Sequence, residues 1–310
     1  MSVESNKIPR GDAGSGIGPR RFFLKTLGVG TGALGLAGSA LSGSARAVVQ
    51  AATVTDVDIA NFALNLEYLE AEYYTFAVTG ASIEALGIPT TGVNTGGGNP
   101  GPIVIKANPK VPFASDVIRQ YATEIAIDEQ KHVLDFRAAL GAQAVARPAV
   151  DLLNSFAALG ALIGVPGFDP FANDLNFLIG AYIFEDVGVS SFHGAAPLIR
   201  STALLDTAAG ILAVEGEHAG LIRTVLFQMG QGPVTDAISD VRRMLGGSVD
   251  YGVDNGPLAR GPKGTASVFL SDINGMAPAR TFRQVLNILY GGVNAPSGGF
   301  FPAGLNGTIR

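Results

Sequence analysis

The chain has 310 residues, of which 47% are hydrophobic and 15% are charged, a composition typical of an ordered globular protein. It contains no cysteine, which excludes disulfides, thiol catalysis and cysteine-ligated zinc or iron–sulfur centres. Residues 1–47 carry six basic and two acidic side chains, which leaves 15 basic and 24 acidic ones, a net charge of −9, for the rest. A net negative charge of this size makes residues 48–310 a poor candidate for binding nucleic acid. With three histidines in total, any metal site must rely on carboxylates, which suit iron or manganese better than copper.

The first 47 residues have the pattern of an export signal. Residues 19–25, Pro-Arg-Arg-Phe-Phe-Leu-Lys, resemble the twin-arginine motif, and a weakly hydrophobic run over residues 26–44 follows. Ala45-Arg46-Ala47 is a small-residue cleavage site. A membrane anchor is the alternative, but the run is shorter than the roughly 20 strongly apolar residues of a membrane span. We predict export of the folded protein by the twin-arginine route to the periplasm or beyond, a mature chain from Val48, and no membrane anchor after cleavage.

Apolar residues recur at helical spacing in four long segments, which predicts helices over residues 56–79, 115–140, 171–192 and 203–229. Asp56 or Asp58 can cap the first helix, and Ser115 or Asp116 the second. The connection between the second and third helices is long and holds a short helix near residues 151–159. Such a crossover allows the third helix to lie beside the others in a four-helix bundle.

The remaining segments are rich in glycine and proline. Residues 80–114 are predicted to form a long loop with a short strand at 103–105. Residues 231–310 contain one clear helical pattern, over 278–290, and too little periodic apolar sequence to bury a core of their own. We therefore expect a bundle over residues 48–230 and a C-terminal extension over 231–310 that packs on it.

Two of the three histidines lie in a repeated Glu-x-x-His pattern. Glu129 and His132 share one helix face, as do Glu215 and His218, and both faces also carry the apolar residues of their helices. Glu185 lies in the middle of an apolar run on the third predicted helix, and the first helix offers Glu67 or Glu70. Two Glu-x-x-His helices with one Glu from each of two other helices form the ligand set of a ferritin-like dimetal bundle.

A core of buried ion pairs is the alternative interpretation. No Lys or Arg shares the apolar faces that carry these carboxylates, whereas two divalent cations would neutralise them. The other nearby groups have simpler roles. His193 is expected to cap a helix end or pack there, and tyrosines 73, 74 and 182 to be core aromatics. The flanking acids Glu72, Glu124, Asp186 and Glu217 are expected to be solvated or to lie behind the ligands.

Three segments resemble the ferritin-like domain family that includes bacterial and plant desiccation-related proteins. They are residues 61–74, 182–189 and 211–223, and the closing residues 298–307 are similar to the family's C-terminal end. The resemblance covers about residues 54–307. It implies an all-α, ferritin-like four-helix fold, while it implies function only weakly.

Comparison with ferritins proper distinguishes the two acids of the first helix. Asn65-Leu66-Glu67 followed by Tyr74 resembles the ferritin pattern of a ligand Glu with a nearby Tyr, which favours Glu67, with Glu70 as the alternative. Asp128 matches an Asp that hydrogen-bonds a ligand histidine in bacterioferritins. The equivalent position before Glu215 is Val214, so a strictly symmetric site is not expected.

The leading hypothesis is an exported protein that binds two iron ions, or alternatively two manganese ions, through Glu67, Glu129, His132, Glu185, Glu215 and His218. Glu185 or another carboxylate would bridge the metals, and the substrates would be Fe(II), O2 or peroxide. A non-catalytic stress or desiccation protein on the same scaffold is the second hypothesis. An iron-storage cage is disfavoured by the 80 additional C-terminal residues, and a smaller homo-oligomer stays open.

Overall fold

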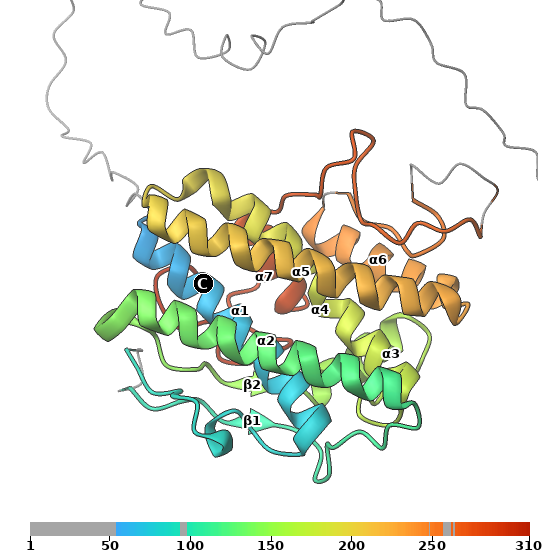
Figure 1. Cartoon of the computed structure of the whole chain (residues 1–310), viewed down its shortest axis with the longest axis horizontal. Helices are drawn as coiled ribbons and strands as arrows, with labels where there is room; N and C mark the ends of the chain where they lie inside the picture. Colours follow the sequence, from blue (N-terminus) through green and yellow to red (C-terminus); the bar gives the residue numbers. More distant parts are fainter. Residues whose placement is uncertain (1–53, 94–97, 248, 257–261, 263) are drawn as a thin grey trace, which may run out of the picture. The chain divides into compact units, whose positions relative to one another are not determined.

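Four long helices form the body of the computed structural model, which describes residues 54–93, 98–247, 249–256, 262 and 264–310 (Figure 1). The predicted export signal lies outside the described residues. The long helices are α1 (Asp56–Thr79), α2 (Asp116–Leu140), α4 (Asp174–Ala195) and α5 (Thr202–Gln228). The all-α fold class is therefore confirmed, and the predicted ends of these helices are within three residues of the observed ones.

The helices pair in antiparallel fashion. Tyr68 on α1 accepts a hydrogen bond from Arg137 on α2, while Thr75, further along α1, accepts one from Gln130, nearer the start of α2. The same reversal relates α4 to α5, because Tyr182 contacts Arg223 whereas Gly188 lies against Glu215. These two pairs pack on one another to form the bundle.

The start of α1 differs from the prediction. Thr55 is the N-cap, and Asp58 completes a capping box by accepting from the backbone N–H of Thr55. Asp56 does not cap α1. Its carboxylate instead accepts hydrogen bonds from the backbone N–H groups of Arg200 and Ser201 at the start of α5. The second helix is capped by Ser115, one of the two expected residues.

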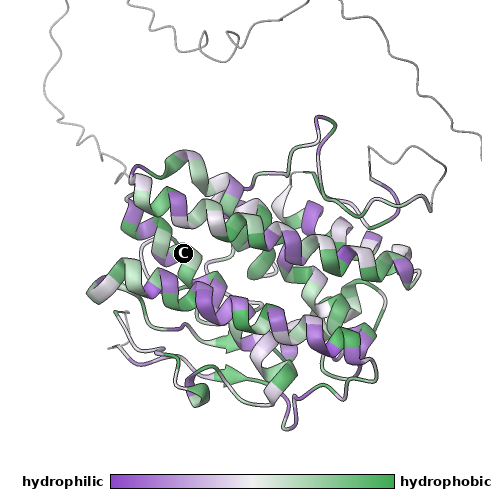
Figure 2. Cartoon of the chain, in the orientation of Figure 1, coloured by the Kyte–Doolittle hydropathy of each residue, from purple (hydrophilic) through white to green (hydrophobic). Residues whose placement is uncertain are grey.

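Two of the long helices are buried on every side. All residues from Ile59 to Ala77 of α1 and from Phe177 to Phe192 of α4 are buried, as expected for helices without a polar face. In contrast, α2 and α5 each bury one face. Figure 2 shows hydrophilic turns recurring along the side of α2 that faces the viewer. The buried faces of α2 and α5, which carry the two Glu-x-x-His pairs, therefore pack toward α1 and α4.

The connections are mostly irregular. The predicted strand at 103–105 is β1 (Ile103–Val104), which pairs in parallel with β2 (Val150–Asp151), a partner that the sequence did not suggest. The other short elements are α3 (Asn154–Leu162) and the 3₁₀ turns η1 (Glu84–Leu86), η2 (Gly141–Gln143) and η3 (Ala196–Leu198). Among the helices that the structure describes, none has the length and apolar character needed to cross a membrane.

The C-terminal region holds two helices rather than the one predicted. In addition to α7 (Phe282–Leu289), helix α6 covers Gly232–Gly246. Its buried face consists mostly of small or polar residues, including Thr235, Ser239 and Arg242, with Ile238 as its one large apolar member. Val234, Ile238, Val241 and Leu245 nevertheless recur at helical spacing, so the sequence did contain a helix signal that the prediction missed.

The chain end packs on the bundle. The ring of Phe300 lies 5.0 Å from that of Phe156 and 4.8 Å from that of Phe184, centroid to centroid. Asn306 and Asn65 exchange two hydrogen bonds between side-chain amide and backbone groups, at 2.9 and 3.2 Å. These contacts help to bury α1 and α4, the two helices without a polar face.

Candidate metal centre

The four long helices each bring acidic side chains to one region of the bundle interior. Glu67 comes from α1 and Glu185 from α4, whereas α2 and α5 each supply a Glu-x-x-His pair. All six predicted side chains are buried, and no more than 5% of any of these residues is exposed. The helical spacing places each Glu one turn from its His, so the two members of a pair face the same interior point.

One group of possible ligands surrounds His132. Its Nδ1 atom lies 3.3 Å from Glu67 Oε2, 3.4 Å from Glu129 Oε2 and 3.7 Å from Glu215 Oε1. In this group the four ligand atoms all lie within 4.8 Å of one another. Metal–ligand distances of about 2.0–2.2 Å are compatible with such a spread after small side-chain adjustments.

A second group surrounds His218. Its Nδ1 atom lies 3.1 Å from Glu129 Oε1 and 3.7 Å from Glu185 Oε2. Glu129 thus belongs to both groups and presents one oxygen to each histidine, whose ring centroids are 6.2 Å apart. Of the carboxylates considered as a bridge, Glu129 rather than Glu185 holds the shared position.

The hydrogen-bonding of these side chains tests whether a cation fits. Nine buried atoms of the six residues have no hydrogen-bond partner: Glu67 Oε1 and Oε2, Glu129 Oε1 and Oε2, His132 Nδ1, Glu185 Oε2, Glu215 Oε1 and Oε2, and His218 Nδ1. Unpartnered buried polar atoms are rare, and buried charges are costly unless paired. No Lys or Arg of the described residues forms an ion pair with any of the four Glu side chains. Four carboxylates and two imidazoles therefore fit divalent cations.

The pKa values of the four carboxyl groups also indicate that the cluster lacks positive charge. Burial raises the pKa of Glu67 to about 7 and that of Glu185 to about 8, and it raises the pKa of Glu215 well above its usual value. For Glu129, burial opposes ionisation, but the two neighbouring imidazoles outweigh it and lower the pKa to about 2. Without a cation, the cluster retains protons that bound metal ions would replace.

The two histidines differ in their outer contacts. Asp128 Oδ2 lies 3.2 Å from Nε2 of His218, the contact expected for this residue. An Nε2–H that donates to Asp128 leaves the Nδ1 lone pair directed at the carboxylates. At the corresponding position beside His132 stands Val214, which has no polar side chain. The two halves of the site are therefore unequal, as the sequence predicted.

Tyr74 and Glu70 lie close to the six residues. The Tyr74 hydroxyl donates a short hydrogen bond to Glu185 Oε1, so this tyrosine is both a core aromatic and a support for a carboxylate. Glu70 belongs to neither group of possible ligands, whereas Glu67 does. The buried Glu70 nevertheless lies near Glu215, since both have a carboxylate oxygen close to Gly188.

Gly188 is a site residue that sequence reasoning missed. A Cβ atom at this position would lie 2.2 Å from Glu215 Oε2 and 3.3 Å from Glu70 Oε1. Gly188 stands one turn after Glu185 on α4, so the missing side chain makes room for the carboxylate that α5 supplies. The one-turn spacing from Glu185 is the only sequence signal that could have indicated it.

The flanking acids divide into two classes. Glu124 and Glu217 are exposed, as expected. Glu72 is instead buried in an ion pair with Arg147, and Asp186 is buried in an ion pair with Arg223 at 2.8 Å, so a solvated role is wrong for both. Their arginines come from distant parts of the chain or from a neighbouring helix, which is why the sequence did not reveal the pairing.

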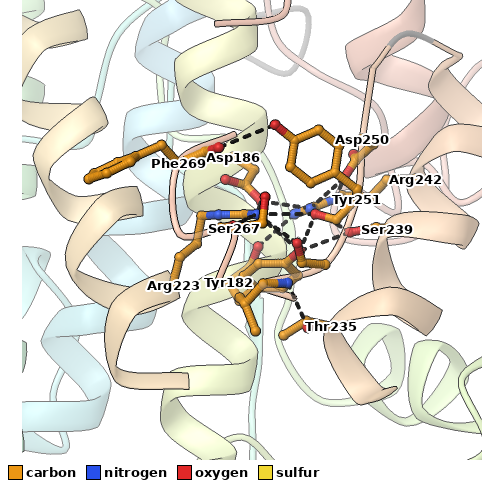
Figure 3. A network of polar contacts seen from close by, with 12 residues as sticks. Tyr182, Asp186, Arg223, Thr235, Ser239, Arg242, Asp250, Tyr251, Ser267 and Phe269 are labelled. Carbon is orange, nitrogen blue, oxygen red and sulfur yellow. Dashed lines mark hydrogen bonds and ion pairs between the residues drawn. The ribbon is translucent and has the colours of Figure 1, made fainter. Parts of the chain in front are cut away.

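Asp186 belongs to a larger set of buried ions, here called the arginine network: Asp186, Arg223, Arg242, Asp250 and Arg280 (Figure 3). Arg242 binds both acids, at 2.7 Å from Asp186 and 2.8 Å from Asp250. Tyr182 lies under the guanidinium of Arg242, which is 4.6 Å from the ring centroid. Glu185 and Asp186 are adjacent in sequence, yet they face two different buried clusters.

The third histidine and Tyr73 have the structural roles expected. His193 lies near the end of α4, and its Nδ1 atom is 2.8 Å from the carbonyl oxygen of Ala277. Tyr73 donates a hydrogen bond to the carbonyl of Phe177 and packs among aromatic rings.

Comparison with known proteins agrees with this architecture. A model described as a ferritin-like domain matches residues 55–228. The chain is 32% identical over 262 residues to the desiccation-related protein PCC13-62 of Craterostigma plantagineum, covering 78% of this chain and 80% of that protein. It is 29% identical over 274 residues to the ferritin-like catalase Nec2 of Nesocodon mauritianus, covering 82% and 84%. No solved structure matches the chain. On the family model and the first of these relatives, the chain belongs to the ferritin-like domain family.

Proposed function

We propose that the mature chain is an exported oxidoreductase that holds two metal ions between α1, α2, α4 and α5. The observation that supports this most is the set of nine unpartnered buried atoms on Glu67, Glu129, His132, Glu185, Glu215 and His218. Oxygen donors with one imidazole for each ion suit iron, and manganese is the alternative. A pair of such ions, when bound, supplies redox equivalents and Lewis acidity to peroxide, O2 or a further Fe(II).

The chain's own residues would prepare the site for this chemistry. Glu129 offers one oxygen to each half, so it would help to hold both ions. Asp128 holds the outer proton of His218, and Tyr74 orients the carboxylate of Glu185. The burial of α1 and α4 keeps bulk water from the carboxylates, which strengthens every electrostatic interaction among them.

Peroxide is the first substrate to examine. One relative is named a ferritin-like catalase, and its similarity extends over most of both chains. In such a reaction one peroxide is oxidised to O2 and another is reduced to two waters, so no further reductant is required. Oxidation of Fe(II) by O2 or peroxide would use the same carboxylates and is the second reaction to examine.

The direct test is metal analysis of the mature protein, loaded anaerobically with Fe(II) or Mn(II) and then desalted. We expect about two ions per chain, the number that this ligand set holds in ferritin-like bundles. Peroxide consumption with release of half an equivalent of O2 would follow loading. Fewer than about 0.2 ions per chain with both metals, below one-tenth of that number, would overturn the proposal.

The matched variant carries Glu129→Ala together with His218→Ala, which removes the shared carboxylate and one imidazole. Loss of both metal and peroxide consumption with an unchanged helical circular dichroism spectrum supports the oxidoreductase. A control with Glu124→Ala and Glu217→Ala changes exposed residues of the same two helices and should retain both properties.

A non-catalytic protective role is the second candidate, because the other relative is named a desiccation-related protein. In that case the bundle would serve as a scaffold, with a structural metal or none. Protection of a labile enzyme during drying that is equal for the wild type and the Glu129→Ala, His218→Ala variant would favour this role. Protection that depends on the two ligands would favour the metal-dependent one.

Export is proposed from the sequence of residues 19–47. Replacing Arg20 and Arg21 by Lys should keep the protein in the cytoplasm, because the twin-arginine route reads the arginine pair. Cell fractionation of the two forms, with a protein exported by the general route as control, tests it. Equal export of both forms would contradict the proposed route.

A further inference from the structure

A surface groove of about 710 Å³ lies between α2 and α5. These two helices are the ones that carry the Glu-x-x-His pairs, and each buries only one face. Figure 1 shows α2 and α5 running beside one another, and all the lining residues of the groove belong to these two helices. The groove is therefore formed by the outer edges of the two ligand-bearing helices.

The groove reaches the metal centre through one histidine. His132 is among its lining residues, although only 5% of this residue is exposed. The Nδ1 atom of the same ring lies within 3.7 Å of Glu67, Glu129 and Glu215. The imidazole of His132 therefore lies between solvent in the groove and three buried carboxylates.

His218 is not among the lining residues of the groove, although it is about as exposed as His132. Asp128 covers the outer nitrogen of His218, whereas Val214, on the groove wall, stands where His132 would need an equivalent acid. The ring of His132 is therefore not tied by a carboxylate on its outer side. The contacts that hold this ring are those of Nδ1 with Glu67, Glu129 and Glu215 on the inner side.

The charges on the groove wall favour a cation. Three acids line the groove, Asp128, Asp135 and Asp206, against one base, Lys131. Asp135 and Asp206 are exposed, and neither forms an ion pair within the described residues. A concave surface of one sign raises the local concentration of oppositely charged ions and their association rate by about 10- to 1000-fold at low ionic strength.

We propose that this groove is the route by which divalent cations reach the metal centre, with Asp135 and Asp206 attracting them and His132 as the final barrier. The inference rests on the proposed function, since it assumes that the six residues bind metal. It assigns different tasks to the two halves of the site: the His132 half admits the ion, and the His218 half is held in place by Asp128.

The test measures the rate at which the metal-free mature protein takes up Co(II). A stopped-flow instrument records this rate through an indicator of free Co(II). The first comparison uses two double variants. One carries Asp135→Asn and Asp206→Asn in the groove, and its control carries Glu124→Gln and Glu217→Gln. Both pairs remove two charges from α2 and α5, but Glu124 and Glu217 do not line the groove. We expect the groove pair to slow uptake about 10-fold near 10 mM ionic strength and less than 2-fold near 0.5 M.

The second pair tests the path sterically. A Cβ atom added at Gly210 or at Gly216 would meet nothing within 4 Å, and both residues are exposed on α5. Gly210 lines the groove and Gly216 does not. We expect Gly210→Leu to slow Co(II) uptake at every ionic strength, while Gly216→Leu leaves the rate unchanged. The final stoichiometry should be that of the wild type in both.

The outcomes separate the route from the function. If the wild type takes up no Co(II), the proposed metal centre is wrong. If it takes up Co(II) but the groove variants match their controls at low ionic strength, the centre stands and the route is overturned. Slower uptake by both groove variants, with unchanged stoichiometry and unchanged controls, supports the route.

Discussion

Two clusters of buried charge lie on neighbouring faces of α4 and have opposite chemistry. Asp186 turns to the arginine network, where it accepts hydrogen bonds from Arg223 and Arg242 at 2.8 and 2.7 Å. Glu185, one residue earlier, turns to a cluster with four carboxylates and two imidazoles but no Lys or Arg pairs among the described residues. The network has permanent counter-charges in its guanidinium groups, whereas in the candidate metal centre only the two imidazoles can carry positive charge in the absence of a bound cation.

The comparison shows how to distinguish structural from functional burial of charge. A buried acid with two arginine donors is accounted for by the fold alone. A buried acid without such donors either keeps its proton, as the raised pKa values of Glu67, Glu185 and Glu215 describe, or is compensated by a cation from outside the chain. Carboxylate-to-amide changes should therefore destabilise the metal-free protein strongly in the arginine network and little in the candidate metal centre, which two of the four predictions test directly.

The largest effect is expected from Asp186→Asn. The change leaves Arg223 and Arg242 without one of their charged partners in a site where neither is more than 2% exposed. We expect the metal-free protein to lose about 3–5 kcal/mol of unfolding free energy, the usual cost of breaking a buried ion pair. Urea unfolding followed by circular dichroism measures it, with Glu217→Gln as an exposed control. A loss below 1 kcal/mol would show that the network is not a structural counterpart to the metal centre.

The second prediction concerns the stabilisation that bound metal gives to the folded protein. Adding metal at 100 times its dissociation constant should stabilise the wild type by about 2.7 kcal/mol, because the ion binds only the folded state. The variant with Glu129→Ala and His218→Ala should show little or no stabilisation. Thermal unfolding at several metal concentrations provides the measurement, and equal shifts in both proteins would place the bound metal elsewhere.

A smaller effect is expected from Asp128→Ala. Asp128 orients His218 from outside the cluster, and loss of such a contact typically weakens metal binding by about 10- to 100-fold. Glu124→Ala, one turn earlier on the same face of the chain's second long helix, is the exposed control. Competition with a chelator of known affinity gives the ratio of dissociation constants. An unchanged ratio would mean that His218 needs no support from this acid.

The smallest change in stability is expected from Glu215→Gln in the metal-free protein. Neither oxygen of Glu215 has a hydrogen-bond partner to lose, and an amide carries no charge next to Glu70. The unfolding free energy should change by less than about 1 kcal/mol, while metal binding weakens. Asp186→Asn is the same change from carboxylate to amide, but there we expect a large loss of unfolding free energy. A large destabilisation would indicate that Glu215 has a structural partner within the protein.

Several features of the fold could be predicted because they depend on local sequence. The four long helices were identified from apolar spacing, and their predicted ends were close to the observed ones. Helix α6 was missed although Val234, Ile238, Val241 and Leu245 have helical spacing, and its buried face also holds polar residues such as Arg242. That polar face is stabilised by Asp186 and Asp250, and Asp186 is 56 positions away in the chain. Local periodicity contains no information about such a partner.

Some features of the candidate site could likewise be predicted from the sequence, whereas others required the structure. The two Glu-x-x-His pairs and Glu185 were identified from spacing and from an acid in an apolar run, and the structure brings them together with Glu67. Their role as ligands stays a prediction. The structure was needed to show that Glu129 is shared between the two groups and that Gly188 makes room for Glu215. It also showed that Glu72 and Asp186 are paired with arginines.

The sequence alone determined which side chains share a helix face, because 3.6 residues per turn is a property of the backbone wherever the helix lies. It therefore determined the two Glu-x-x-His pairs, the four-helix class and the absence of a Cys-ligated centre. Only the tertiary structure decided which buried acids have a guanidinium partner and which do not, because that depends on residues distant in the chain meeting across a core. The arginines that compensate Asp186, and the unpartnered carboxylates beside Glu185, belong to that second kind of information.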